Sequence, residues 1–271
     1  MTREPICRFD ILLLAMVLSG WLFAGGTPSK AYAGDISLGT VLELGEADRN
    51  AVAILGKGVV GRALPARPIA DAAHLMPLVP GRWIYRVLTG DPSDQAQEDV
   101  MARSRHDKTG KSWRHVVGKQ FIEYFRLGSS GNIELVSEVD LEEDVITQYA
   151  PTFSVIHEGM SPGETRPLET EIGVYGLHDP TYAKYSGRVK ATHTYVGAYE
   201  VVVPAGTYPT VLIKSTYKGK VGPASVDDVG YVFYSPGVGI VAAVERSHVS
   251  AFFFYDKTTR TPKVLLRREA P

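Results

Sequence analysis

The chain has 271 residues, of which 44% are hydrophobic, and its 29 Lys and Arg almost balance its 30 Asp and Glu. This composition is typical of a folded globular protein and excludes a disordered chain and a polytopic membrane protein. The near-neutral charge provides no basic field that would attract phosphates, so nucleic acid is not expected as a partner.

Residues 1–33 have the pattern of a cleavable export signal. Arg3 and Arg8 precede an apolar run over 11–23, and an Ala-Tyr-Ala sequence at 31–33 provides a cleavage site. The run is about 13 residues long, whereas a transmembrane helix needs about 20, so a retained membrane anchor is the less favoured alternative. We predict a mature chain without a stable transmembrane span, located in the periplasm, with release from the cell as the alternative.

Residues 34–80 are predicted to form an N-terminal arm that packs along the main domain. Apolar residues on one stripe predict a short helix over 46–55, which Gly56 and Gly58 would end. The prolines that follow are spaced too closely for regular structure. They are Pro65, Pro68, Pro77 and Pro80.

Residues 81–271 are predicted to form one domain of antiparallel strands, because aromatic and β-branched residues recur with period two between turn residues. The segments 121–127 and 133–137, joined by a Gly-rich turn, predict a hairpin. Further strands are predicted over 200–203, 211–217, 230–234, 240–246, 251–255 and 264–266. A sheet of about ten strands must curl. We therefore expect a mainly β fold, a strongly curved antiparallel sheet that forms an incomplete barrel with a concave apolar face.

Aromatic residues supply candidate walls for that concave face. The sequence Phe-Phe-Phe-Tyr at 252–255 places rings on both faces of one strand, so each face must be covered. Either protein covers both faces, or one face lines a cavity for an apolar ligand. The candidate ligand-binding residues are Trp83, Tyr85, Phe121, Phe125, Phe233 and Phe253.

The histidines and carboxylates show no motif for catalysis or metal binding. His157-Glu158 lacks a second His one helical turn away, and His178-Asp179 adjoins a turn. A hydrolase or isomerase built from these four side chains would need them to converge within about 4 Å in a cleft. The only cysteine, Cys7, leaves with the signal. We therefore assign no catalytic residue, no metal and no cofactor, and we expect a protein that is not an enzyme.

A run of acidic residues follows the predicted hairpin. It lacks the glycine-centred loop of a dedicated calcium site. We interpret it as a solvated strand edge that discourages pairing with other chains. The run consists of Glu138, Asp140, Glu142, Glu143 and Asp144.

Two parts of the chain resemble exported bacterial proteins of the TapB-like and lipoprotein-localisation (Lol-like) type. The first is PLVPGRWIY at 77–85, and the second is GAYEVVVPAGTY at 197–208 followed by YSPGVGIV at 234–241. These motifs hold turn residues and no catalytic group. The resemblance implies a curved antiparallel sheet around a helix, residence in the cell envelope, and a site for an acyl chain or a hydrophobic peptide.

Two functions follow from these expectations. The first is a non-enzymatic envelope protein that binds an apolar ligand, either a lipid or a lipidated protein, in the concave face of the sheet. The second is a structural or protein-interaction module of the envelope that has another envelope protein as its partner and no small-molecule ligand.

Overall fold

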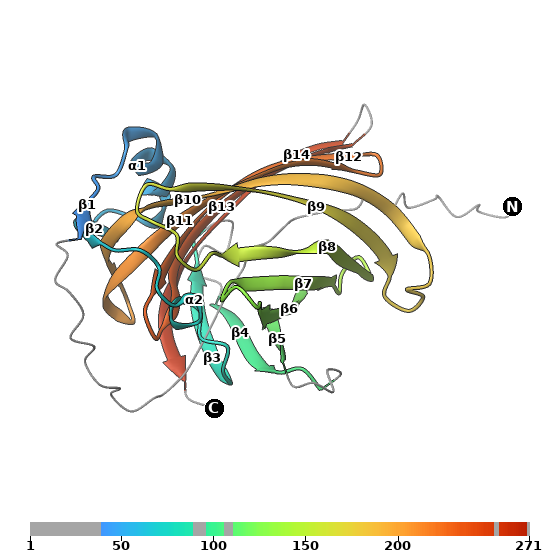
Figure 1. Cartoon of the computed structure of the whole chain (residues 1–271), viewed down its shortest axis with the longest axis horizontal. Coiled ribbons are helices and arrows are strands. Elements are labelled where there is room, and N and C mark those ends of the chain that lie inside the picture. Colours follow the sequence, from blue (N-terminus) through green and yellow to red (C-terminus); the bar gives the residue numbers. More distant parts are fainter. Residues whose placement is uncertain (1–38, 89–95, 106–110, 252–254, 270–271) are drawn as a thin grey trace, which may run out of the picture.

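The fold is a closed antiparallel barrel of 12 strands (Figure 1). The computed structural model describes residues 39–88, 96–105, 111–251 and 255–269. The export signal predicted for residues 1–33 lies outside these ranges, as does Phe253.

The barrel strands pair in chain order, each with the next, and the last strand pairs with the first. They are β3 (Gly81–Val87), β4 (Ala96–Arg103), β5 (Ser112–Val117), β6 (Phe121–Leu127), β7 (Ile133–Asp140), β8 (Val145–Ile156), β9 (Thr165–Gly176), β10 (Ala183–Val203), β11 (Gly206–Val221), β12 (Ala224–Ser235), β13 (Gly239–Ala251) and β14 (Tyr255–Glu269). Strands β9 to β14 arch over strands β4 to β8 (Figure 1).

The expectation of an incomplete barrel is therefore wrong. The ring closes where β14 pairs with β3, with Lys263 opposite Val87 and Glu269 opposite Arg82. This pairing joins the two ends of the strand-rich region and satisfies the backbone groups that both edge strands would otherwise expose. The predicted hairpin of 121–127 and 133–137 is confirmed as β6 and β7.

The segment before the barrel contains β1 (Thr40–Val41), α1 (Glu46–Val52), the 3-10 helix η1 (Ala53–Leu55), β2 (Val60–Ala66) and α2 (Ala72–Leu75). The helix expected over 46–55 is present as α1 and η1, and it ends at Gly56, whose φ of 111° favours glycine. The expectation of irregular structure around Pro65 is wrong, because Pro65 belongs to β2, which pairs with the second half of β10.

Helix α1 is fixed to the outer face of the barrel by Asp48. Its Oδ1 accepts hydrogen bonds from Lys214 Nζ on β11 at 2.6 Å and from Tyr231 OH on β12 at 2.8 Å. The core between the arm and the strands is apolar and includes Val52 and Leu55.

Helix α2 joins turns at one end of the barrel, which we call the α2 end. His74 O accepts from Gly237 N in the β12–β13 turn at 2.7 Å, and Ile69 N donates to Met160 O in the β8–β9 loop at 2.9 Å. Because successive strands alternate in direction, these two connections lie at the same end. Leu75 and Met76 are buried there. Among the described residues, no helix combines the length and apolar character needed to cross a bilayer.

Candidate functional site

Alternation along the strands directs a set of charged side chains into the barrel. On β5 the inward positions are Trp113, His115 and Val117, and on β6 Glu123 lies directly opposite His115. The same face receives ionisable residues from four other strands, and we call the whole set the interior polar network. Its members are Asp99 on β4, His115 on β5, Glu123 on β6, Glu138 on β7, Glu245 on β13 and Lys263 on β14.

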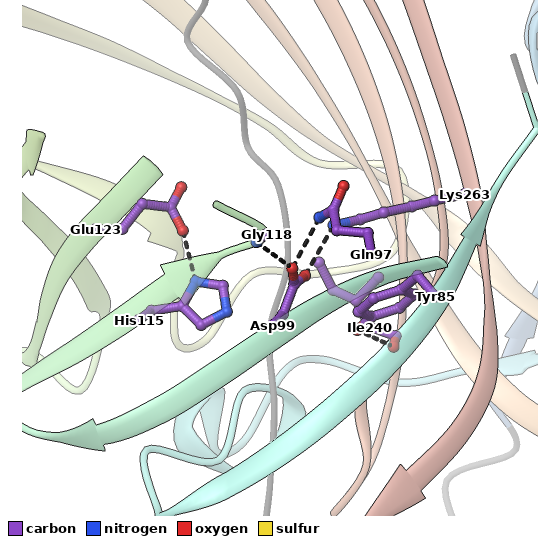
Figure 2. A network of polar contacts seen from close by, with 8 residues as sticks. All are labelled: Tyr85, Gln97, Asp99, His115, Gly118, Glu123, Ile240 and Lys263. Atoms are coloured by element: carbon purple, nitrogen blue, oxygen red, sulfur yellow. Dashed lines mark hydrogen bonds and ion pairs between the residues drawn. The ribbon is translucent and has the colours of Figure 1, made fainter. Parts of the chain in front are cut away.

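The first contact in this network is a buried ion pair between Asp99 and Lys263 (Figure 2). Lys263 Nζ lies 3.2 Å from Asp99 Oδ2 and 4.5 Å from the centroid of the Tyr85 ring. Asp99 Oδ1 accepts from Gln97 Nε2 at 2.8 Å and from Gly118 N at 3.1 Å. Burial raises the pKa of Asp99 although the Lys263 charge acts in the opposite direction.

The second contact is between His115 and Glu123, with 2.7 Å between Nδ1 and Oε2 (Figure 2). Neither residue has solvent exposure. Burial lowers the pKa of His115 well below its usual value and raises the pKa of Glu123 well above its usual value. Burial therefore favours the uncharged form of both groups, the neutral imidazole and the protonated carboxyl group. Glu123 Oε1 has no hydrogen-bond partner within the part of the chain that the structure describes.

The remaining carboxyl groups repel one another inside the barrel. Burial and the charge of Asp140 raise the pKa of Glu138 to about 8. Burial and the charges of Asp228 and Glu138 raise the pKa of Glu245 well above its usual value. Lys263 is the cation that acts on Asp99, Glu123 and Glu245. Among the described residues, the interior is therefore richer in carboxyl groups than in basic side chains.

A cluster of rings borders this network, and we call it the aromatic cluster. Its members are Tyr149, Phe153, His157, His193 and Tyr217. The ring centroids of Phe153 and Tyr217 are 5.5 Å apart, and those of His157 and His193 are 5.3 Å apart. The charges of Glu138 and Glu123 contribute to the raised pKa of Tyr149, which places this ring beside the network.

His193 is the most enclosed polar group of the aromatic cluster. Its Nδ1 lies 3.2 Å from Ser215 Oγ, and its Nε2 has no hydrogen-bond partner among the described residues. Burial, and then the charge of His157, lower the pKa of His193 to about 3. The ring is therefore neutral at physiological pH.

Four of the six candidate wall residues face the interior. Trp83 and Tyr85 share a face with Asp99 and Gln97, and Phe121 and Phe125 share one with Glu123. All four are buried. The interior they line is not the purely apolar face that was expected, because charged groups alternate with the rings.

The prediction that Phe233 lines the concave face is wrong. It lies opposite Leu212 and Ala242 and two residues after Tyr231, whose hydroxyl group binds Asp48 of α1. Its side chain therefore faces outwards and is buried beneath the arm. Phe253, the sixth candidate, lies outside the described residues.

The four side chains of the hydrolase hypothesis do not converge. His178 and Asp179 lie in the exposed β9–β10 turn, where His178 Nε2 is 3.3 Å from Asp144 Oδ1. His157 and Glu158 lie in the β8–β9 loop at the α2 end, which is the opposite end of β9. The described residues hold no group of three potential metal ligands.

The interpretation of the acidic run as a solvated edge is wrong for its first two members. Glu138 and Asp140 are buried on β7. Asp140 Oδ1 accepts from Glu142 N at 2.9 Å and from Glu143 N at 3.1 Å, which stabilises the β7–β8 turn. Glu142 and Asp144 are exposed.

The charged members of the network were missed, although the sequence contains a signal for them. Glu123 shares one face of its strand with Phe121 and Phe125. His115 likewise shares one face with Trp113 and Val117. A charged residue at such a position is expected to lie in the interior with a partner. The partner of Asp99 is 164 positions away in the chain, so no local pattern identifies it.

No known protein family matches the chain, and no curated protein matches it. Solved structures are similar to it at low identity. A "putative lipoprotein" from Parabacteroides distasonis ATCC 8503 is 11% identical with a TM-score of 0.36, covering 73% of this chain and 100% of that one. A "putative exported protein with YmcC-like fold" from Bacteroides fragilis NCTC 9343 is 14% identical with a TM-score of 0.40, covering 75% and 98%.

The hypothetical lipoprotein YmcC from Escherichia coli (K12) is 10% identical with a TM-score of 0.36, covering 70% of this chain and 87% of that one. The descriptions of these neighbours speak of lipoproteins, exported proteins and a YmcC-like fold. They do not name the TapB-like or Lol-like type, so that finer resemblance is not supported.

Proposed function

We propose that this protein is an exported, non-enzymatic binding protein of the cell envelope, which encloses a small molecule with an apolar body inside its barrel. The observation that carries this proposal is Glu123 Oε1, a buried oxygen with no hydrogen-bond partner among the described residues. Such an atom costs free energy unless a further group satisfies it. A bound molecule that reaches the network would supply that group.

The exposure of Glu245 supports a space inside the barrel. Its pairing partners Gly230 and Thr261 put its side chain on the inner face, and the charges of Glu138 and Lys263 act on it there. It is nevertheless partly exposed, unlike Glu138 and Lys263. Part of Glu245 therefore remains accessible to solvent.

The walls of that space suit an apolar body. Trp83, Tyr85 and Phe125 are buried beside the network, and the aromatic cluster borders it. Each CH₂ group that leaves water on binding contributes about 0.8 kcal/mol, so a chain of several carbons is enough for reversible capture. The segment around α2 covers the α2 end, so we expect a ligand to enter from the opposite end.

Native mass spectrometry of protein purified from its own envelope, followed by titration of the delipidated protein with a fluorescent fatty-acid probe, tests the proposal. Ala243→Leu adds apolar volume beside Lys263, its pairing partner on the inner face, and we expect it to weaken probe binding about tenfold. Ser250→Leu adds similar volume on the outer face of β13 and is the control.

The proposal fails if no small molecule copurifies and no probe binds. A protein partner captured by crosslinking in intact cells, together with an interior that binds no probe, would favour the structural or interaction module instead.

A further inference from the structure

We propose that the interior site takes an organic cation, a protonated amine or quaternary ammonium group attached to an apolar body, with Glu123, Glu138 and Glu245 facing the charge. This inference rests on the proposed function and names the chemical class of its ligand. It depends on three features of the interior: the distribution of charge, an unsatisfied oxygen and the position of the rings.

The charge of Lys263 is already committed to Asp99. The two groups are 3.2 Å apart, and Gln97 and Gly118 donate to the other oxygen of the same carboxyl group. Glu138 on β7 and Glu245 on β13 face the same interior from opposite sides of the ring of strands. A positive group beside Glu123, Glu138 and Glu245 would balance carboxyl groups that Lys263 does not bind directly.

The unsatisfied oxygen points independently to a hydrogen-bond donor. Glu123 has no solvent exposure, and its Oε2 is bound to His115. Its Oε1 lacks a partner among the described residues. A carboxylate accepts N–H donors and binds charged ones most strongly. In the ionised form of Glu123 an ammonium group satisfies this atom, whereas a ligand carboxylate or ether oxygen does not.

The rings offer a second contact for a cation. Lys263 shows how this interior holds positive charge, since its ammonium group lies against one carboxylate and over the face of Tyr85. Tyr149 and Tyr217 are close enough to Glu123, Glu138 or Glu245 for those charges to raise the pKa of each phenol. Carboxylates beside aromatic faces form the environment in which ammonium ligands bind.

Proton release gives this proposal a distinctive signature. Burial raises the pKa of Glu123, Glu138 and Glu245, which favours their protonated form when no cation is near. A bound cation favours the ionised form and expels protons. The titratable groups that face Glu123 are Asp99 on β4, His115 on β5, Glu138 on β7, Tyr149 on β8, Tyr234 on β12, Glu245 on β13 and Lys263 on β14.

The test compares ligands that differ only in the head group. Octylamine, octyltrimethylammonium, octanol and octanoate are titrated into the full mature protein by isothermal calorimetry in two buffers of different ionisation enthalpy. We expect the cations to bind at least about tenfold more tightly than octanol, with octanoate weakest, and octylamine to release protons. We also expect the affinity for octylamine to rise between about pH 6 and 8.

Variants separate a specific site from general attraction. Glu123→Gln keeps the shape of the side chain but cannot carry charge, and we expect it to reduce the preference for octylamine over octanol about tenfold. Glu98→Gln, at an outward and half-exposed position next to Asp99, is the control. Glu138→Gln is the second test, for use if Glu123→Gln does not fold.

Each outcome decides one of the two proposals. Equal binding of octanol and octylamine, or binding of the amine without proton release, overturns the cation inference but leaves a small-molecule site in place. Absence of binding by all four compounds overturns the cation inference as well. Together with negative mass spectrometry and probe titration, it also overturns the proposed function.

Discussion

Lys263 and Asp99 come from strands that are not neighbours, yet their side chains meet inside the barrel. Lys263 belongs to β14 and Asp99 to β4, and β3 runs between them. The ammonium group reaches over the ring of Tyr85 on β3, with 3.2 Å between Nζ and Oδ2. The ion pair therefore spans the β14–β3 pairing that closes the ring.

Removing one member of this pair should destabilise the barrel. In Lys263→Met, Asp99 stays buried without its cation, so we expect a loss of about 3–5 kcal/mol in the free energy of unfolding, measured by urea denaturation. Adding Asp99→Asn to Lys263→Met should recover part of the loss, because no buried charge then lacks a partner. Lys257→Met, at an exposed position on β14, should change stability by less than about 0.5 kcal/mol. If Lys263→Met also lost less than about 0.5 kcal/mol, the ion pair would not stabilise the barrel.

Some of the strands were predictable from the sequence, but the closure of the barrel was not. Alternation and turn residues identified β6, β7 and parts of β10 to β14. Closure depends on contacts such as Lys263 opposite Val87, which are far apart in the chain and leave no local pattern. The same holds for the role of Phe233, which only the position of the arm reveals.

The aromatic residues of the candidate site were predictable from the sequence, but its charged residues were not. Aromatic residues at inward positions, such as Trp83 and Phe125, are visible as hydrophobic strand residues. Glu123 and His115 also occupy inward positions, but a prediction from hydrophobicity alone assigns charged residues to the surface. To predict the network, the inward position of a residue in the strand alternation would have had to count for more than its charge.

Stability should fall as pH rises from about 6.5 to 8 in the ligand-free protein. The pKa of Glu138 is about 8 in the folded state, well above its value of 4.5 in an unfolded chain. The folded state therefore binds more protons in this window, and stability declines with pH by up to about 1 kcal/mol per pH unit for each such carboxyl group. Urea denaturation at several pH values measures the slope, and Glu138→Gln should reduce it.

Histidines set the lower limit of that window. The pKa values of His115 and His193 are lowered in the folded state, so these two groups bind more protons in the unfolded state below about pH 6.5 and oppose the effect of the carboxyl groups there. Above that pH the histidines lose their remaining protons in the unfolded state, and the carboxyl groups dominate the slope. A flat or rising profile above about pH 6.5 would contradict buried protonated carboxyl groups.

Asp48 should control the attachment of the arm more than the stability of the barrel. Its Oδ1 accepts from Lys214 and Tyr231, and both bonds are lost in Asp48→Ala. We expect a loss of about 1–3 kcal/mol and faster amide hydrogen exchange over α1, with little change in β3 to β8. Glu46→Ala, at an exposed position in the first turn of α1, is the matched control. Uniform exchange changes throughout the barrel would argue against a local role.

Substitution of Phe125 should affect both stability and binding, because its ring forms part of the interior wall. Its side chain has no solvent exposure and faces the interior beside Glu123, whereas Leu127 on the same strand is 50% exposed. Phe125→Ala removes a buried ring and leaves a cavity, so we expect a loss of about 3–5 kcal/mol in the free energy of unfolding. Leu127→Ala should change it by less than about 0.5 kcal/mol. The folded fraction of Phe125→Ala should also bind octylamine and octanol with altered affinity, because the wall of the site has changed. If Phe125→Ala unfolds like the Leu127→Ala control and binds both compounds like the wild type, Phe125 does not line the site.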